Sequence, residues 1–295
     1  MGSNPNQGTT SGSAATRAVA LVGPAGTGKT SLAEALLFAS GAINRLGNVE
    51  AGTTVGDTSP EARARGGSTE LNLLHFEYLG DRYALLDLPG GAGFAADGLA
   101  ALPAADMAVV VIDPAPERAA LAEPVLRQLD ELGVPHAVFV NKIENARAGS
   151  VRELIGKLQP MSREPLALRQ IPIRANDGQG GEHVTGYVDL ALERAYRYRP
   201  GTESERVAIP GELREREQSE RTHLLETLAD FDDALMEAML MDEAPETAAV
   251  MADLAADTRG NKVVPVVLGS ALSGGGVHRL LKLLRPEAPA ADAAA

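Results

Sequence analysis

Short apolar runs alternate with amphipathic stretches along the chain. Continuous runs typical of strands buried on both faces cover residues 18–22, 107–112, 136–140 and 263–268. Stretches with helical periodicity follow them, at residues 31–40, 117–132, 149–158 and 276–284. Two further strand-like runs, 71–78 and 82–88, flank a turn at Gly80-Asp81. The alternation predicts an α/β fold with a mostly parallel sheet.

The pattern changes between residues 161 and 259. This stretch holds one strand candidate (167–173), a glycine-rich turn (177–181) and a long charged amphipathic segment (212–240). We interpret it as an inserted α+β subdomain. The predicted organisation is a disordered leader (1–17), a core (18–160 plus 260–286), the insertion (161–259) and a flexible tail (287–295). Within the core, residues 42–66 are weakly periodic and predict a mobile loop.

Composition and charge exclude several classes of protein. The net charge of −13 argues against a broadly basic surface that wraps nucleic acid such as DNA, although it does not exclude a local contact with RNA. The chain has no Cys, and its five His show no metal-ligand spacing, so a buried metal cage is not expected. No stretch is long and apolar enough to span a bilayer, and no signal peptide is evident. A cytoplasmic protein is the simplest expectation; the sequence does not indicate an oligomeric state.

The strongest motif follows the first predicted strand. Residues 23–30 read GPAGTGKT, which fits the phosphate-binding loop pattern G-x-x-x-x-G-K-S/T. Its glycines allow backbone N–H groups to surround phosphate oxygens at the start of a helix. Lys29 would place a cation between the β- and γ-phosphates, and Thr30 would offer a hydroxyl to Mg²⁺. The predicted phosphate-binding residues are Gly23, Pro24, Ala25, Gly26, Thr27, Gly28, Lys29, Thr30 and Ser31.

A second motif, Asp87-Leu88-Pro89-Gly90, ends another predicted strand. An acidic group at the carboxyl edge of the sheet can hold Mg²⁺ through water, and Gly90 would let a backbone N–H approach the γ-phosphate. Alone, this sequence is also an ordinary turn. In combination with the phosphate-binding loop, we assign Asp87, Pro89, Gly90 and Gly91 to a γ-phosphate switch.

Two later segments predict recognition of guanine. Asn141-Lys142-Ile143-Glu144 follows a strand, where an N-K-x-D motif would contact the base edge, cover the ring and accept from N1–H and the exocyclic amine. Glu144 supplies that acceptor on a side chain one methylene longer; the alternative is a simple helix cap. Backbone N–H groups of Ser270, Ala271 and Leu272, after the last strand, would contact the guanine oxygen.

With these four segments in order, the chain resembles the translational GTPases, most closely the G domain of elongation factor G. The stretches DDALMEAML, GVPHAVFVNK and VVPVVLGSALSGGGVHRLL carry the likeness beyond the nucleotide motifs. The resemblance covers residues 17–287 and implies a P-loop NTPase fold, a doubly wound sheet with the family's inserted subdomain. It also implies GTP/GDP and Mg²⁺ as ligands and the ribosome as partner. The family's later domains would lie outside this chain.

The resemblance aligns Arg65-Gly66-Gly67-Ser68 with the family's first switch. Ser68 would then replace the Thr that ligates Mg²⁺, although an ordinary polar loop residue is the alternative. The predicted metal ligands are therefore Thr30, Ser68 and, through water, Asp87.

Three positions depart from the family pattern. Gly26 replaces an Asp of the phosphate-binding loop, Glu144 replaces the guanine-reading Asp, and Gly91 replaces the His that orients the attacking water. Losing a water-positioning group predicts slow hydrolysis, by about 100-fold or more. The leading hypothesis is a GTP-binding, slowly hydrolysing domain. A nucleotide-gated module without turnover, a P-loop ATPase or small-molecule kinase, and a decayed non-binding domain remain alternatives.

Overall fold

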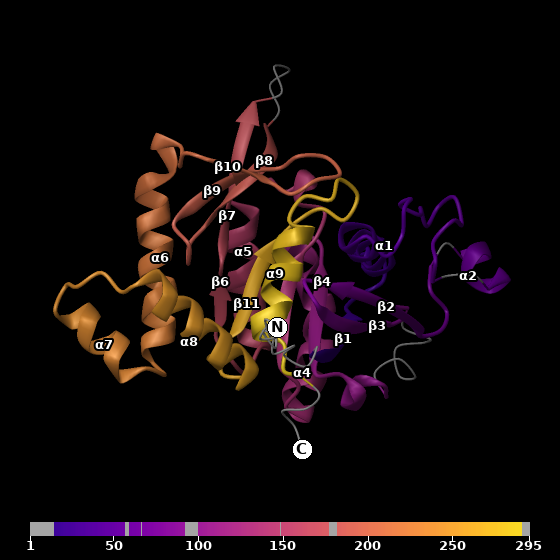
Figure 1. Cartoon of the computed structure of the whole chain (residues 1–295), viewed down its shortest axis with the longest axis horizontal. Helices are drawn as coiled ribbons and strands as arrows, with labels where there is room; N and C mark the ends of the chain where they lie inside the picture. The colour runs from indigo at the N-terminus through magenta and orange to yellow at the C-terminus, as the bar shows by residue number, and fades with distance from the viewer. Residues whose placement is uncertain are drawn as a thin grey trace, which may run out of the picture.

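The computed structural model describes residues 15–56, 59–65, 67–91, 100–147, 149–176 and 182–290. Seven strands form the larger of two sheets: β1 (Thr16–Val22), β2 (Asn72–Tyr78), β3 (Asp81–Asp87), β4 (Met107–Ile112), β5 (His136–Val140), β6 (Leu166–Leu168) and β11 (Val264–Leu268). Their order is β2-β3-β1-β4-β5-β11-β6 (Figure 1), and every neighbouring pair is parallel except β2 with β3. The predicted α/β fold with a mostly parallel sheet is confirmed.

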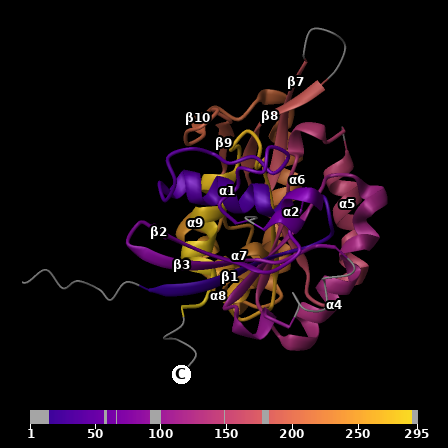
Figure 2. The same ribbon diagram turned by 90° about the vertical axis from the view of Figure 1, so that its right-hand side faces the viewer.

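Helices cover both faces of this sheet. In chain order they are α1 (Lys29–Ser40), α2 (Pro60–Arg65), α4 (Glu123–Leu132), α5 (Ser150–Leu158), α6 (Arg214–Ala229), α7 (Asp233–Leu240), α8 (Thr247–Arg259) and α9 (Val277–Glu287). Figure 2 shows α1 and α9 on one side of the strands and α4 and α5 on the other. Short 3-10 turns add η1 (Leu102–Ala104), η2 (Pro116–Ala122), η3 (Ile143–Asn145), η4 (Gln159–Met161) and η5 (Gly211–Leu213).

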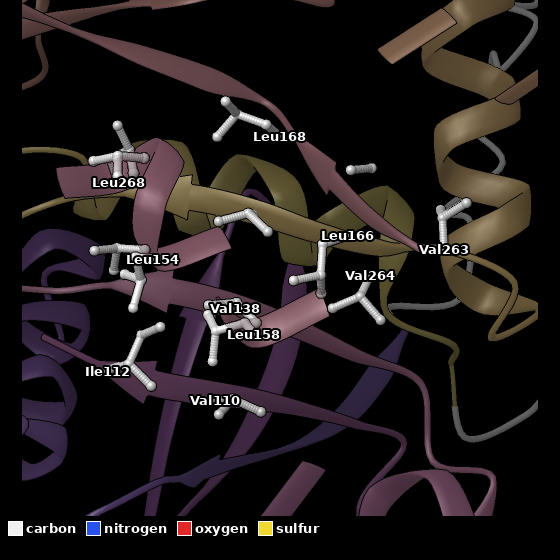
Figure 3. Packing of buried hydrophobic residues seen from close by; sticks show 14 of the residues in the cluster. Val110, Ile112, Val138, Leu154, Leu158, Leu166, Leu168, Val263, Val264 and Leu268 are labelled. Atoms are coloured by element: carbon white, nitrogen blue, oxygen red, sulfur yellow. The ribbon is translucent and has the colours of Figure 1, made fainter. Parts of the chain in front are cut away.

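The apolar strands are buried because both of their faces pack on helices. All residues of β4, β5 and β11 are buried. One hydrophobic cluster joins the sheet to α1 and α9, and the other joins it to α4, α5 and the inserted helices. Figure 3 shows Leu154 and Leu158 of α5 close to Val138 of β5 in the second cluster. The nearly continuous apolar runs of the sequence therefore belong to internal parallel strands.

Parallel pairing brings the strand ends that carry the motifs to one edge. Leu21 of β1 pairs with Asp87 of β3, and Ile112 of β4 pairs with Val140 of β5. Leu268 of β11 also pairs with Val140. The segments that follow β1, β3, β5 and β11 therefore emerge side by side at the carboxyl edge, where open α/β sheets bind ligands.

The smaller sheet comes from the predicted insertion. It contains β7 (Gln170–Asn176), β8 (Glu182–Asp189), β9 (Arg194–Arg197) and β10 (Glu205–Val207), in the order β10-β9-β8-β7. In Figure 1 this sheet stands at the top, and α6, α7 and α8 lie to the left of the main sheet. The insertion has the expected α+β character, although three of its strands, β8, β9 and β10, have no counterpart among the predicted elements.

The predicted single strand at residues 167–173 is in fact two strands in different sheets. The short β6 pairs with β11 in the main sheet, whereas β7 pairs with β8 in the smaller one. Arg169 stands between them: its N–H donates to the Val266 carbonyl at 3.0 Å, and its own carbonyl accepts from Leu190 N–H at 2.9 Å. The backbone changes sheets at this residue, so the first strand of the predicted insertion completes the main sheet.

Other elements differ from the sequence expectation in detail. The amphipathic segment 212–240 divides into α6 and α7, because the Asp232 side chain accepts from the N–H groups of Ala234 and Leu235 and starts a new helix. The predicted mobile loop contains the short helix α2. The stretch 117–132 begins as a 3-10 turn and becomes α-helical only at Glu123. The predicted turn 177–181 lies outside the described residues.

At both ends, the described elements extend past the predicted boundaries of the core. β1 begins at Thr16, two residues before the predicted core, and α9 continues to Glu287, the first residue of the predicted tail. Glu287 is fully buried and pairs with Arg169, which explains why the helix extends that far. Residues 1–14 and 291–295 lie outside the described part. Among the described helices, none has the length and apolar character required to cross a membrane.

Candidate nucleotide-binding site

The predicted phosphate-binding loop connects β1 to α1. Gly23, Gly26 and Gly28 all have positive φ angles. At Gly28 the requirement is also steric, because a Cβ there would lie 2.5 Å from Nδ2 of Asn141. The loop curls tightly before α1, and its last residues place the first turn of that helix at the sheet edge. This is the backbone form in which N–H groups and a helix N-terminus bind phosphate.

Lys29 is held inside this loop. Its ammonium donates to the carbonyls of Gly23 at 2.9 Å and Pro24 at 3.1 Å. Burial lowers the pKa of Lys29 from 10.5 to about 8, and the nearby Asp87 carboxylate only partly opposes that shift. The lysine is therefore a desolvated cation whose charge a bound anion would stabilise.

Gly90 lies directly against the loop and its lysine. A Cβ at Gly90 would stand 2.1 Å from Nζ of Lys29 and 2.8 Å from the Gly23 carbonyl oxygen. Only glycine permits this approach, which brings the segment after β3 alongside the phosphate-binding loop. Pro89 precedes it and Gly91 follows, while residues 92–99 lie outside the described part.

Three side-chain oxygens of the predicted metal ligands meet at the start of α1. The Thr30 hydroxyl donates to Oδ2 of Asp87 at 2.8 Å and lies 2.9 Å from the Ser68 hydroxyl. Asp87 is fully buried, at the end of β3. Two hydroxyls and a carboxylate form a hard oxygen set of the type that Mg²⁺ prefers. The residues present therefore fit the predicted ion, and Ser68 belongs to the segment that the resemblance assigns to the first switch.

Asn141 joins the phosphate side of the site to the predicted base side. Its amide nitrogen donates to the Thr27 carbonyl at 2.8 Å, and its amide oxygen accepts from Ala271 N–H at 2.8 Å. One buried side chain thus holds the phosphate-binding loop and the loop after β11 together. Lys142, with a φ of 56°, donates to the Gly26 carbonyl at 2.6 Å, which lays its alkyl stem along the edge of the site.

The loop after β11 has partners of its own. Ser270 N–H donates to the Gly275 carbonyl at 2.8 Å, and the Ser270 hydroxyl accepts from Ser273 N–H at 3.2 Å. With Ala271 N–H on Asn141, two of the three amides predicted to contact guanine are engaged within the protein. This loop therefore holds Asn141 in place, while Leu272 is 74% exposed.

Glu144 lies in η3, directly after the Asn141-Lys142 pair. Its Oε2 atom is buried and has no hydrogen-bond partner among the described residues. Since η3 is anchored to the loop after β11 by Ile143 N–H on the Gly269 carbonyl at 3.1 Å, the carboxyl group is carried by a fixed backbone. The structure thus groups the predicted guanine-reading residues together.

Arg118 is a residue of this region that the motif patterns do not indicate. It forms an ion pair with Asp113, at the end of β4, and donates to the Ala25 carbonyl of the phosphate-binding loop at 3.3 Å. A hollow of about 430 Å³ beside it is lined by both residues and by Lys142. In the sequence, Arg118 is marked only by its place shortly after an Asp at the end of a strand. That pattern is too common to identify a site residue without the fold.

These features define a P-loop NTPase: a glycine-rich loop surrounds a buried lysine, a cluster of side-chain oxygens lies beside it, and both stand at the carboxyl ends of the parallel strands. The elongation factor Tu GTP-binding domain family matches residues 14–290. The chain belongs to that family, and its likeness is to the G domain of elongation factor G-type translational GTPases.

Curated relatives agree with this assignment. The chain is 40% identical over 273 residues to an elongation factor G-like protein of Synechocystis sp., covering 92% of this chain and 40% of the relative. It is 34% identical to elongation factor G 2 of Streptomyces coelicolor (86% and 36% covered) and 30% identical to mitochondrial ribosome-releasing factor 2 of Yarrowia lipolytica (90% and 34%). The chain thus spans well under half of each relative's length.

A solved structure shares the fold as well. A crystal structure of a protein from Thermus thermophilus superposes with a TM-score of 0.82 at 32% identity. The match covers 94% of this chain and 40% of that one. The fold described above, including the inserted subdomain, is therefore shared across nearly the whole chain.

Proposed function

We propose that this chain is the GTP-binding domain of an elongation factor G-like translational GTPase. It binds GTP and GDP with Mg²⁺ and hydrolyses GTP slowly, in connection with translation on cytoplasmic ribosomes. The observation that carries the proposal is the double hydrogen bond of Asn141, which connects the phosphate-binding loop to the loop after β11. A ligand that contacts both loops would have one end at the phosphate-binding loop and the other at the loop after β11, as a guanine nucleotide does.

The chemistry of the surrounding residues supports this ligand. Lys29 supplies a buried cation, and the N-terminus of α1 adds backbone donors for phosphate. The Glu144 carboxylate suits the N1–H and amino group of guanine, whereas adenine offers no donor at N1. Thr30, Ser68 and Asp87 would hold Mg²⁺, which when bound neutralises charge on the phosphate oxygens.

Calorimetry with Mg²⁺-GDP, Mg²⁺-GTP and Mg²⁺-ATP tests the proposal. We expect guanine nucleotides to bind at micromolar or tighter affinity and ATP at least about tenfold more weakly, since discrimination rests on the Glu144 hydrogen bonds. Lys29→Ala should abolish measurable binding, whereas Lys157→Ala, which removes an exposed lysine on α5, should not. Equal affinity for ATP would refute guanine selectivity, and unchanged binding by Lys29→Ala would refute the role of the loop.

Gly91 favours a second candidate function, a nucleotide-gated module without turnover. Phosphoryl transfer depends on positioning an attacking water, and a glycine has no side chain to do so. Single-turnover hydrolysis of GTP, measured with and without ribosomes, separates the two functions. Release of phosphate faster than the buffer blank supports the GTPase, and a rate equal to the blank in both arms supports the gated module.

A further inference from the structure

The segment after β9 of the inserted subdomain lies against the predicted guanine pocket. Tyr198 is fixed by its N–H on the Thr185 carbonyl of β8 at 2.8 Å. Its ring packs on Gly275, where an added Cβ would stand 3.0 Å from two ring atoms. Gly275 in turn accepts from Ser270 N–H, in the loop after β11. Tyr198 therefore supports a loop of the site from a distant part of the sequence.

Two buried polar atoms in this region have no hydrogen-bond partner among the described residues. One is Oε2 of Glu144 and the other is the phenol oxygen of Tyr198. The Glu144 carboxylate accepts hydrogen bonds only, and a phenol can donate one. Both atoms are buried, so leaving them unpaired is unfavourable.

The Glu144 carboxylate is close enough to contribute to the pKa of the Tyr198 phenol. Burial, the Tyr187 phenol and the Glu144 carboxylate together raise the pKa of Tyr198, so the phenol keeps its proton at any physiological pH. Tyr187 contributes a ring 5.8 Å away, centroid to centroid, which restricts the position of Tyr198. The donor is thus both protonated and held in place.

We propose that Tyr198 is a positioning residue for guanine recognition, which donates a hydrogen bond to the Glu144 carboxylate when nucleotide is bound. Glu144 has one more rotatable bond than the Asp expected in an N-K-x-D motif, and the phenol would restrict that freedom. The carboxylate retains lone pairs on both oxygens to accept from the base. The inference rests on the proposed guanine binding and gives the inserted subdomain a part in selectivity.

Tyr198→Phe tests the inference by comparing GDP with IDP, whose base lacks the 2-amino group. Binding of GDP by the wild-type protein tests separately the guanine-nucleotide binding on which the inference rests. We then expect Tyr198→Phe to weaken GDP binding by about tenfold and IDP binding by less. The reason is that the less restrained Glu144 carboxylate accepts from the 2-amino group, which GDP has and IDP lacks. The selectivity ratio should fall, a change that a purely structural tyrosine would not produce.

Two further variants act as controls. Tyr196→Phe removes the phenol of a neighbouring tyrosine, which stacks on Tyr187 at 5.2 Å, and should leave the GDP to IDP ratio unchanged. In a Glu144→Asp background the shorter carboxylate withdraws from Tyr198, so adding Tyr198→Phe should change neither affinity. Equal losses of GDP and IDP in Tyr198→Phe, or the same loss in the Glu144→Asp background, would overturn the inference.

Discussion

At the scale of single residues, Lys29 places a buried ammonium group inside the predicted phosphate-binding loop. Its pKa near 8 leaves it partly neutral in mildly alkaline solution, because burial outweighs the attraction of Asp87. The unfolded chain would hold this proton up to about pH 10.5, so burial of the charged Lys29 lowers the free energy of unfolding below pH 8. That cost is relieved as pH rises from 8 towards 10.5. A bound phosphate reverses the shift by stabilising the charged form.

Nucleotide binding should therefore take up a proton at alkaline pH. At pH 9 about nine tenths of free Lys29 is neutral, so we expect uptake of nearly one proton per GDP, against about one tenth at pH 7. Affinity should weaken above pH 8. Calorimetry in two buffers of different ionisation enthalpy measures the uptake, and an equal value at both pH values would contradict the assignment.

Gly91 allows the water-positioning account to be tested directly. We expect Gly91→His to raise the single-turnover rate of GTP hydrolysis by about 100-fold if an imidazole there orients the water. Gly91→Ala adds a Cβ without the ring and should leave the rate unchanged. No acceleration by Gly91→His in a protein that still binds GTP would count against this account.

The motif residues could be predicted from sequence because strand ends and glycine spacing determine where they lie. The meeting of Thr30 and Asp87 follows from the register of β1 with β3, whereas Ser68 is expected there only from the family resemblance. Tyr198 could not be predicted in this way, because it reaches the site through the pairing of two inserted strands. Such long-range contacts leave no local pattern in the sequence.

At the scale of elements, the break between β6 and β7 joins the two sheets. The Arg169 guanidinium and the Glu287 carboxylate, both fully buried, meet at 2.8 Å, and the Thr258 hydroxyl also donates to Glu287 at 3.3 Å. This ion pair connects the crossover to the end of α9. Neither the break nor the pair could be predicted from the sequence, because the local pattern indicates one continuous strand and a flexible tail.

Removing one partner of that pair should be costly. We expect Glu287→Gln to lower the free energy of unfolding by about 3 kcal/mol, because the Arg169 charge stays buried without its counterion. Glu153→Gln, which breaks an exposed pair with Lys157, should cost about 1 kcal/mol or less. Denaturant titration of the wild type and the two variants measures both changes in the free energy of unfolding. Equal losses in Glu287→Gln and Glu153→Gln would show that burial of the ion pair does not matter.

At the scale of the whole molecule, ion pairs bind the inserted subdomain to the core. Arg279 of α9 pairs with Asp189 of β8 at 2.7 Å, and both side chains are buried. Within the insertion itself, the Arg221 guanidinium of α6 donates to the Leu190 carbonyl at 2.6 Å, directly after β8. The insertion is thus packed on the core through buried charges and apolar helices.

We therefore expect core and insertion to unfold together. In hydrogen exchange under mild denaturant, amides of β4 and β8 should lose protection at the same denaturant concentration. Arg279→Ala, which leaves the Asp189 charge buried, should separate the two transitions. Loss of protection in β8 well before β4 in the unmodified protein would show instead that the insertion unfolds alone.

The position of β11 has a consequence for biosynthesis. This strand lies between β5 and β6, yet it follows every other described strand in the chain. A polypeptide leaving the exit tunnel in order would present an unpaired β5 edge until residue 268 had emerged. The nucleotide site needs the loop after β11, so it would be among the last parts of this domain to assemble during synthesis. A nascent chain halted earlier would expose the unpaired edge of β5 and its apolar side chains to chaperones.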